Sequence, residues 1–242
     1  MINPEHIARA PAAAIPKPVA LKRLLWPALF ASLIAGAAIS LAQQAFVIPL
    51  ILQAELIEAG SSAHHAVGAA VQAGMERTGY TVLFNWLTAF GYALLLAACF
   101  AWTRTTSWRT GLLWGVAGFA SFALAPALGL SPELPGSHAA DLTARQTWWI
   151  GTALASSAGL ACVFLVRRRP IKVIGVVLIA LPHLIGAPVA PEGDSAVPAE
   201  MTRAFVAGSL GQSLLMWLLL GALTAAFLRR FSPRTPYPAE RD

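Results

Sequence analysis

The sequence predicts an all-α integral membrane protein with six transmembrane helices. The 242-residue chain is 57% hydrophobic, only 12% of it is charged, and its apolar residues gather into long runs. Charged residues usually make up about a quarter of a soluble protein, so an ordinary soluble domain is excluded. A helix needs about 20 mainly apolar residues to cross a bilayer, and this chain has room for one compact bundle of such spans.

Six apolar runs reach or nearly reach that length, and the fifth is the shortest and most interrupted. In chain order they are Leu24–Leu52, Thr81–Trp102, Gly111–Leu128, Thr147–Val166, Val173–Ala190 and Phe205–Leu228. We expect a transmembrane domain over residues 21–230, a disordered Pro/Ala-rich N-terminus over 1–20 and a cytoplasmic tail over 231–242. Ser40-Leu41-Ala42 resembles a signal-peptide cleavage site. The apolar run continues to Leu52, however, which favours an uncleaved first span.

The basic residues predict the orientation of these spans. Only Arg77, Arg145 and Arg203 fall in segments on one side, whereas the other side holds Arg9, Lys17, Lys22, Arg23, Arg104, Arg109, Arg167, Arg168, Arg169, Lys172, Arg229, Arg230, Arg234 and Arg241. Cytoplasmic loops carry the Lys/Arg excess, so both termini are expected in the cytoplasm. Because topology accounts for the net charge of +6, no nucleic-acid partner is expected.

Acidic residues show the opposite bias. The expected outer side holds Glu55, Glu58, Glu76, Glu133, Asp141, Glu192, Asp194 and Glu200. A solvated outer surface would explain this distribution, and so would a negative vestibule that concentrates cations.

The three outer segments suggest three pseudo-repeated helical hairpins. Each has a helix, an outer segment with an acid and an arginine, and a returning helix. Two of these acid–arginine pairs, Asp141 with Arg145 and Glu200 with Arg203, are four and three residues apart, so we expect structural ion pairs on one helical face. Ordinary caps and turns of membrane hairpins would give a similar pattern without any repeat.

Few polar side chains interrupt the spans. The amides are Gln43, Gln44, Asn85 and Gln212. They can line a translocation path, or they can form hydrogen bonds between helices, which typically contribute less than about 2 kcal/mol.

Histidines are the candidate metal ligands. His183 lies in the fifth run directly after Pro182, which frees a backbone carbonyl, and a polar group beside a broken helix at membrane depth suggests a ligand path. His64, His65 and His138, with Glu133, lie in outer segments and could collect a divalent ion. Plain exposed loop histidines are the alternative interpretation.

No enzyme is predicted. The chain has no GxxxxGK[ST], GxSxG or HExxH motif and no paired carboxylates within a span.

Several motifs together resemble the CbtA family. They are Leu41-Ala42-Gln43-Gln44, Gly115–Phe119, Leu124–Leu130, Pro132–Gly136, Ala144–Trp149 and Leu181–Pro188. The resemblance runs from about Leu21 to Arg230. It implies a bacterial inner-membrane cobalt transporter subunit linked to cobalamin metabolism, often found with a small one-span, His-bearing partner called CbtB.

The leading hypothesis is an inner-membrane importer, or importer subunit, for a divalent transition metal, with cobalt implied by the resemblance. Cobalt would be the substrate, and no permanently bound cofactor is expected. The alternative is a non-transporting scaffold or assembly subunit of a metal-uptake complex. The expected partners are the bilayer, a CbtB-like subunit and further copies of this chain.

Overall fold

The fold was analysed in a computed structural model that describes residues 21–59, 67–105, 107–191 and 197–231. Helices hold 85% of these residues, and no strand occurs among them. The expected N-terminus (1–20) and residues 232–242 of the expected tail lie outside the described residues, whereas Phe231 ends the last helix.

Six helical stretches make up this part of the chain, and two of them change from α to π geometry partway. The elements are α1 (Lys22–Ala42), η2 (Gln43–Val47), α2 (Ile48–Ala59), α3 (Val67–Thr103), α4 (Trp108–Phe119), η4 (Ala120–Leu124), α5 (Ala125–Ala127), α6 (Leu142–Leu165), α7 (Arg169–Ile185) and α8 (Ala199–Phe231). Here η marks a π-helical segment.

Five of the six stretches are long and apolar enough to cross a membrane: 22–58, 74–103, 108–127, 142–165 and 199–231. The sixth stretch, α7, has 17 residues, which gives a length of about 25 Å. Gly186, with φ of 91°, ends this helix in a conformation that favours glycine. The structure thus confirms the all-helical class and five candidate spans, while the sixth crossing stays a prediction.

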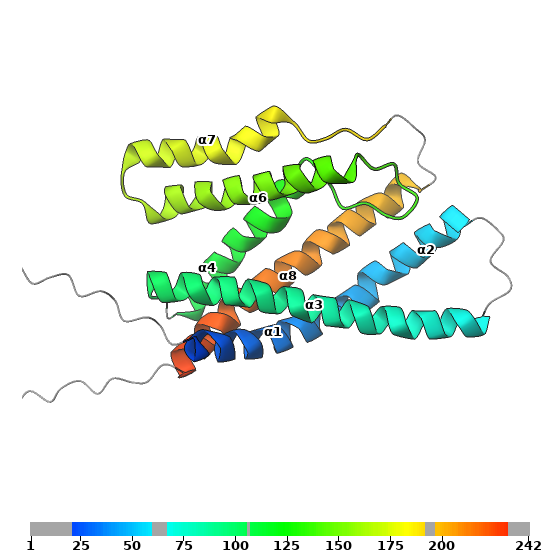
Figure 1. Cartoon of the computed structure of the whole chain (residues 1–242), viewed down its shortest axis with the longest axis horizontal. Coiled ribbons are helices and arrows are strands. Elements are labelled where there is room, and N and C mark those ends of the chain that lie inside the picture. Colours follow the sequence, from blue (N-terminus) through cyan, green and yellow to red (C-terminus); the bar gives the residue numbers. More distant parts are fainter. Residues whose placement is uncertain (1–20, 60–66, 106, 192–196, 232–242) are drawn as a thin grey trace, which may run out of the picture.

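The helices run up and down, so both described termini and two of the connections lie at one end of the bundle (Figure 1). The Arg167–Lys172 cluster lies at that end, together with Arg104, Arg109 and the last residues of α8. Glu55, Glu133 and Glu200 belong to the opposite end. The charge separation expected from the sequence is therefore present in the fold.

Close backbone contacts hold α4 against α8. A Cβ atom on Gly111 would overlap the carbonyl oxygen of Gly221, and a Cβ atom on Gly221 would overlap that of Gly111. Added Cβ atoms on Gly115 and Gly118 would collide with Trp217. Glycine lets the backbones of membrane helices approach closely, where van der Waals contact replaces the hydrophobic effect as the source of stability.

Trp217 of α8 is the centre of the main core. Its side chain is 1% exposed. Its ring centroid lies 4.5 Å from that of Tyr92 on α3 and 5.4 Å from that of Phe122 in η4. Three helical stretches that are distant in sequence therefore meet at one aromatic side chain.

The first helix bends away from α3 beyond η2. α2 rises toward the start of α8 (Figure 1), and the two meet in a small cluster of Val47, Ala54, Leu134, Val197 and Phe205. A π segment is a recognised cause of a helix kink. The bend separates α2 from the outer half of α3, whose residues 74–80 are all exposed.

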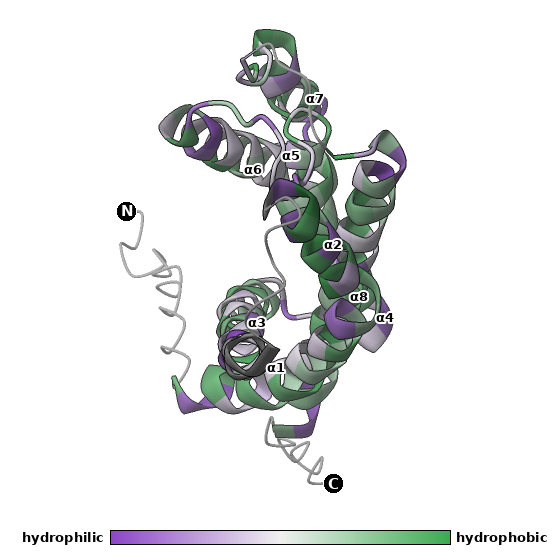
Figure 2. Cartoon of the chain, turned by 90° about the vertical axis from the view of Figure 1, so that its right-hand side faces the viewer, coloured by the Kyte–Doolittle hydropathy of each residue, from purple (hydrophilic) through white to green (hydrophobic). Residues whose placement is uncertain are grey.

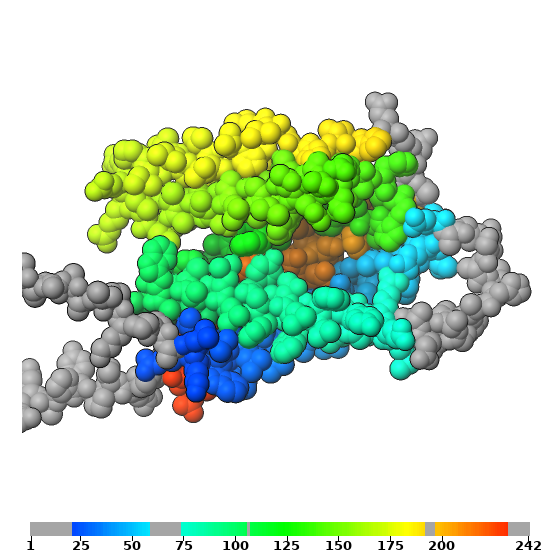
Figure 3. All heavy atoms as spheres, in the orientation of Figure 1, coloured from blue at the N-terminus to red at the C-terminus, as the bar shows by residue number. Residues whose placement is uncertain are grey.

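The hairpin of α6 and α7 forms the other edge of the bundle. α7 packs mainly on α6, and Figure 2 shows it as the outermost helix at the top of the view. Val173, Ile174, Val176 and Val177 are more than half exposed, as expected for a helix that faces lipid. Figure 3 shows a hollow between α6 and α3, with atoms of α8 visible at its floor.

Candidate functional site

The first candidate site is a cavity between η2 and α3. Its volume is about 590 Å³, and it is lined by Gln43 from η2 and by Glu76, Arg77, Tyr80, Thr81, Phe84 and Asn85 from α3. Glu76, Tyr80 and Phe84 are spaced four residues apart, so one face of α3 supplies them. The lining therefore extends along α3 from its exposed outer end inward to Asn85.

A cluster of three polar side chains, Ser40, Gln43 and Asn85, marks the inner end of this cavity. The Asn85 Nδ2 group donates to Gln43 Oε1 at 2.6 Å and to Ser40 Oγ at 3.3 Å. Both amide side chains are half-buried and Ser40 is buried. We name these residues the amide cluster. It joins α1 and η2 to α3 and places side-chain oxygen atoms at the inner end of the first cavity.

The backbone explains why glutamines sit at this point. The Ile48 N–H donates to the Gln43 carbonyl five residues back, as π geometry requires. Pro49 has no N–H, and its ring would clash with the carbonyl four residues earlier in a regular helix. The wider π turn accommodates the proline, and such segments are frequent at functional sites.

Gln44 lies one residue further along η2 and makes a different contact. Its Nε2 donates to Thr78 Oγ1 at 3.5 Å, and that hydroxyl donates to the Gly74 carbonyl. At the outer end, Arg77 donates to both Glu55 oxygens, at 2.8 and 2.9 Å. An ion pair between α2 and α3 therefore lies at the outer end of this open cavity.

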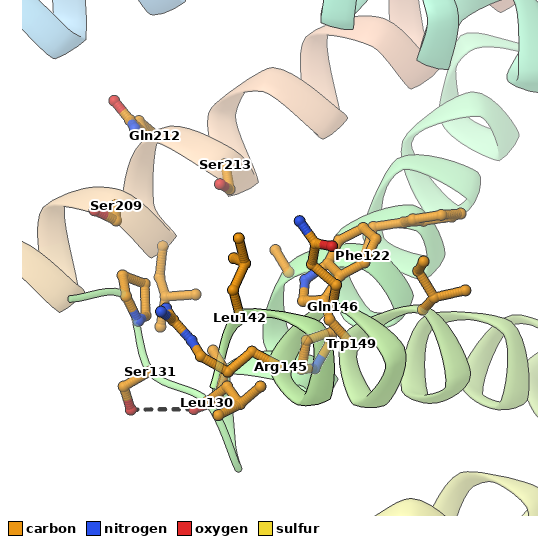
Figure 4. A pocket seen from close by; sticks show the side chains of 16 residues that line it. Phe122, Leu130, Ser131, Leu142, Arg145, Gln146, Trp149, Ser209, Gln212 and Ser213 are labelled. Carbon is orange, nitrogen blue, oxygen red and sulfur yellow. Dashed lines mark hydrogen bonds between the residues drawn. The ribbon is translucent and has the colours of Figure 1, made fainter. Parts of the chain in front are cut away.

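A second cavity, of about 630 Å³, lies between η4, α5, α6 and α8. Its lining is largely apolar, with polar groups from Arg145, Gln146, Ser209, Gln212 and Ser213. Figure 4 shows Gln146 extending from α6 toward the α8 residues Ser209 and Ser213. Gln212 points away from Gln146 in the same view. Its Oε1 is buried and has no hydrogen-bond partner among the described residues.

Two of the expected ion pairs are wrong. Arg145 pairs with Glu133 of the outer loop at 2.8 Å, whereas Asp141 caps α6 by accepting from the Ala144 N–H at 2.9 Å. The carboxylate at a helix start is held by backbone donors, which leaves Arg145 free to reach the loop. Glu200 and Arg203 form no ion pair with any described residue, and both are exposed.

The histidines do not gather around either cavity in the described part of the chain. His183 is half-buried, and its ring centroid lies 6.0 Å from that of Trp148 in an edge-on arrangement. His138 is exposed in the outer loop. His64 and His65 lie outside the described residues. Among the described residues, no group of three His, Cys, Asp or Glu side chains could hold a metal ion.

The ordered motifs therefore belong to a bundle of helices, most of them long and apolar enough to cross a membrane, with two open cavities between them. A family model described as "Probable cobalt transporter subunit (CbtA)" matches residues 21–229, which is most of the chain. The chain belongs to the CbtA family. No curated protein and no solved structure matches this CbtA protein.

Family membership supports cobalt transport as the activity of this CbtA protein's family and supports a multi-pass membrane protein. The match spans all six helical stretches, so both cavities belong to the shared domain.

Sequence reasoning found three of the four amides that line the cavities, Gln43, Asn85 and Gln212, but not Gln146, and it missed several of their neighbours. Ser40, Tyr80 and Thr81 surround Gln43 and Asn85. Ser209 and Ser213 accompany Gln212 on α8. The four-residue spacing of Thr81 with Asn85 and of Ser209 with Ser213 was a visible signal, but serine and threonine are common in membrane helices.

Proposed function

We propose that this CbtA protein is an importer, or importer subunit, that carries cobalt(II) inward across the bacterial inner membrane, with both termini in the cytoplasm. The amide cluster carries this proposal, because it presents side-chain oxygen atoms at the inner end of the first cavity, between η2 and α3. The family assignment favours cobalt as the ion. A link to cobalamin synthesis is part of the same proposal.

Weak oxygen contacts suit passage better than tight chelation. Conduction requires that an ion bind well enough to arrive and weakly enough to leave. The described residues hold no cluster of metal-binding side chains, so the ion would keep part of its water shell. Moving inward, a divalent cation gains about 2.3 kcal/mol for each of its charges per 100 mV of membrane potential. A membrane potential can therefore drive this route.

The outer carboxylate Glu76 would raise the local concentration of cations at the first cavity. It lines that cavity, is exposed and has no ion-pair partner among the described residues. We expect Glu76→Gln to raise the cobalt concentration for half-maximal uptake about threefold and to leave the maximal rate unchanged, because a negative mouth enriches the ion locally. Initial uptake rates in proteoliposomes over a cobalt series test this.

Glu200→Gln is the matched control, since Glu200 is an exposed acid at the same end but lines neither cavity. Equal effects of the two substitutions would show that general surface charge, rather than Glu76, attracts the ion.

His183 as a metal contact is tested by His183→Phe. The phenyl ring keeps the edge-on contact with Trp148 and removes both ring nitrogens. Because His183 lines neither cavity, we expect uptake to stay within about twofold of the wild type, which is the range of surface and packing changes. A collapse of uptake with normal expression would instead assign His183 to the route.

A non-transporting scaffold is the second candidate function. The observation that favours it is that the amide cluster already forms hydrogen bonds between helices, as purely structural amides do. Reconstituted protein separates the two functions. An importer takes up cobalt when a potassium gradient and valinomycin set an inside-negative potential, whereas a scaffold takes up none.

The same vesicles address the possible partners. Addition of a one-span, CbtB-like subunit to the vesicles should raise the rate of cobalt uptake if such a partner completes the importer. Self-association of this chain is measured separately, by size-exclusion chromatography with light scattering.

A further inference from the structure

Two hairpins of the protein repeat one arrangement of parts. In the first, the π segment η2 begins at Gln43 and a proline follows six residues later, at Pro49. In the second, η4 begins at Ala120 and Pro126 again follows six residues later. In both, the widened turn directly precedes the proline, which has no N–H to donate and whose ring would clash with a carbonyl of a regular helix.

Each hairpin also carries an ion pair beyond its proline. Glu55 lies six residues after Pro49 and binds Arg77, ten residues beyond the first residue of the returning helix α3, at 2.8 Å. Glu133 lies seven residues after Pro126 and binds Arg145 at the start of the returning helix α6, also at 2.8 Å. We call these two pairs the outer latches. Each joins an outgoing arm to its own returning helix.

Short arms lie between the π segments and the latches. α2 has 12 residues, and outside its own hairpin it contacts a small cluster at the start of α8. α5 has three residues and leads directly into the outer loop. Because π segments are common sites of helix bending, each arm can bend relative to the rest of its helix at η2 or η4.

The two cavities lie in equivalent places in the two units. Gln43 of η2 and Arg77 of the first latch line the first cavity. Phe122 of η4 and Arg145 of the second latch line the second cavity. In each unit, a bend at the π segment that separated the latch would widen the outer mouth of the cavity. The described part of the third hairpin has neither a π segment nor a latch.

We propose that the two units form the paired outer gate of the cation route, with the π segments as hinges and the Glu55–Arg77 and Glu133–Arg145 pairs as latches. An arriving divalent cation competes with the arginine for the latch carboxylate. Loss of the ion pair allows the arm to bend at its π segment, which widens the outer mouth of the cavity. This inference rests on the proposed transport function and assigns the gate within it.

Reversible cross-linking of each latch tests the gate. In protein with Cys99 and Cys162 replaced by alanine, the variants Glu55→Cys/Arg77→Cys and Glu133→Cys/Arg145→Cys are treated from outside with a bis-methanethiosulfonate reagent. This reagent spans a gap that a direct disulfide could not. We expect cobalt uptake to stop on cross-linking and to return after dithiothreitol. Undiminished uptake by cross-linked protein would overturn the proposed gate.

The matched control is Glu200→Cys/Arg203→Cys. Both residues lie on α8 three positions apart at the same outer end, so a cross-link there ties one helix to itself and restrains no hinge. Its uptake should not change with the reagent. A loss equal to that of the latch variants would attribute the effect to the reagent and overturn the assignment.

Labelling of Thr81→Cys, in the same cysteine-free protein, tests the gate without using transport. Thr81 is half-buried and lines the first cavity inside the latch. We expect Glu55→Gln to raise its rate of labelling by an impermeant maleimide about threefold, the population change that one exposed ion pair supports. The exchanged pair Glu55→Arg/Arg77→Glu should restore the slower rate. An unchanged rate in Glu55→Gln would refute the latch, whereas absent uptake in the wild type would refute only transport.

Discussion

Replacing Gly221 by valine is expected to cause the largest loss of stability of any single substitution considered for this protein. A side chain at this position would overlap the backbone of Gly111 and would come within 3.0 Å of the Gly115 N atom. These are backbone atoms, so no rotamer change can relieve the collision. α4 and α8 would have to move apart, and the core around Trp217 would lose packing contacts between these two helices.

Overpacking of this kind costs about 1–3 kcal/mol, and the upper end applies here because backbone atoms are involved. At about 2–4 °C per kcal/mol for a chain of this size, the melting temperature should fall by about 6–12 °C. Thermal unfolding of the detergent-solubilised protein, followed by fluorescence size-exclusion chromatography, measures the shift.

Gly211→Val is the matched control for this substitution. Gly211 lies on the same helix, and an added Cβ atom there meets nothing within 4 Å. Its variant should melt within about 1 °C of the wild type, as surface changes usually do. If both variants melted at the same temperature, close approach of α4 and α8 would not be a source of stability.

The second large effect is expected at Asn85, where leucine should abolish most cobalt uptake. Leucine removes an oxygen from the inner end of the first cavity and leaves Gln43 Oε1 without its donor. One lost polar contact at a half-buried site costs about 1–2 kcal/mol, so we expect uptake to fall about tenfold. Initial rates of labelled cobalt uptake into proteoliposomes, normalised to inserted protein, measure this.

Asn85→Asp distinguishes ion contact from helix packing. The carboxylate keeps the side-chain oxygen, replaces the NH₂ group by a second oxygen and adds a negative charge, while Gln43 and Ser40 can turn to act as donors. If Asn85 contacts the ion, this variant should retain uptake and reach half-maximal rate at a lower cobalt concentration. If the aspartate and leucine variants were equally impaired, Asn85 would serve only to join α3 to the first helix.

Thr88→Leu is the control for position on the helix. Thr88 follows Asn85 by three residues on α3, is exposed and lines neither cavity. Its replacement should leave uptake unchanged because it removes no contact with the proposed route.

The fold was largely predictable because its causes are local. The predicted run Gly111–Leu128 matches a helical stretch over 108–127, and the run Thr147–Val166 ends one residue beyond α6, which begins earlier, at Leu142 after its cap Asp141. Hydrocarbon excludes unpaired backbone groups, so a long apolar run has few alternatives to a helix. The fifth run was predicted to end at Ala190, but α7 ends at Ile185 because Gly186 adopts a positive φ.

The candidate site was less predictable because it depends on which helices meet. The sequence placed Gln43 and Asn85 in separate spans and left open whether they met. Their hydrogen bond follows from the packing of α1 against α3, and their cavity follows from the bend at η2. His183 was the most conspicuous polar residue of the spans, yet its position on an edge helix directs its ring to Trp148.

The sequence by itself determined the membrane class, the order of the spans, the charge asymmetry between the two ends and the family, since apolar runs, basic loops and ordered motifs are all linear features. Only the tertiary structure decided that Arg145 binds Glu133 rather than Asp141, that the π segments precede Pro49 and Pro126, and that each lies beside a cavity. The cavities depend on which helices meet, and so on contacts between segments far apart in the chain. Close contacts such as that of Gly111 with Gly221 belong to the same level of structure, which no periodicity in one segment can reveal.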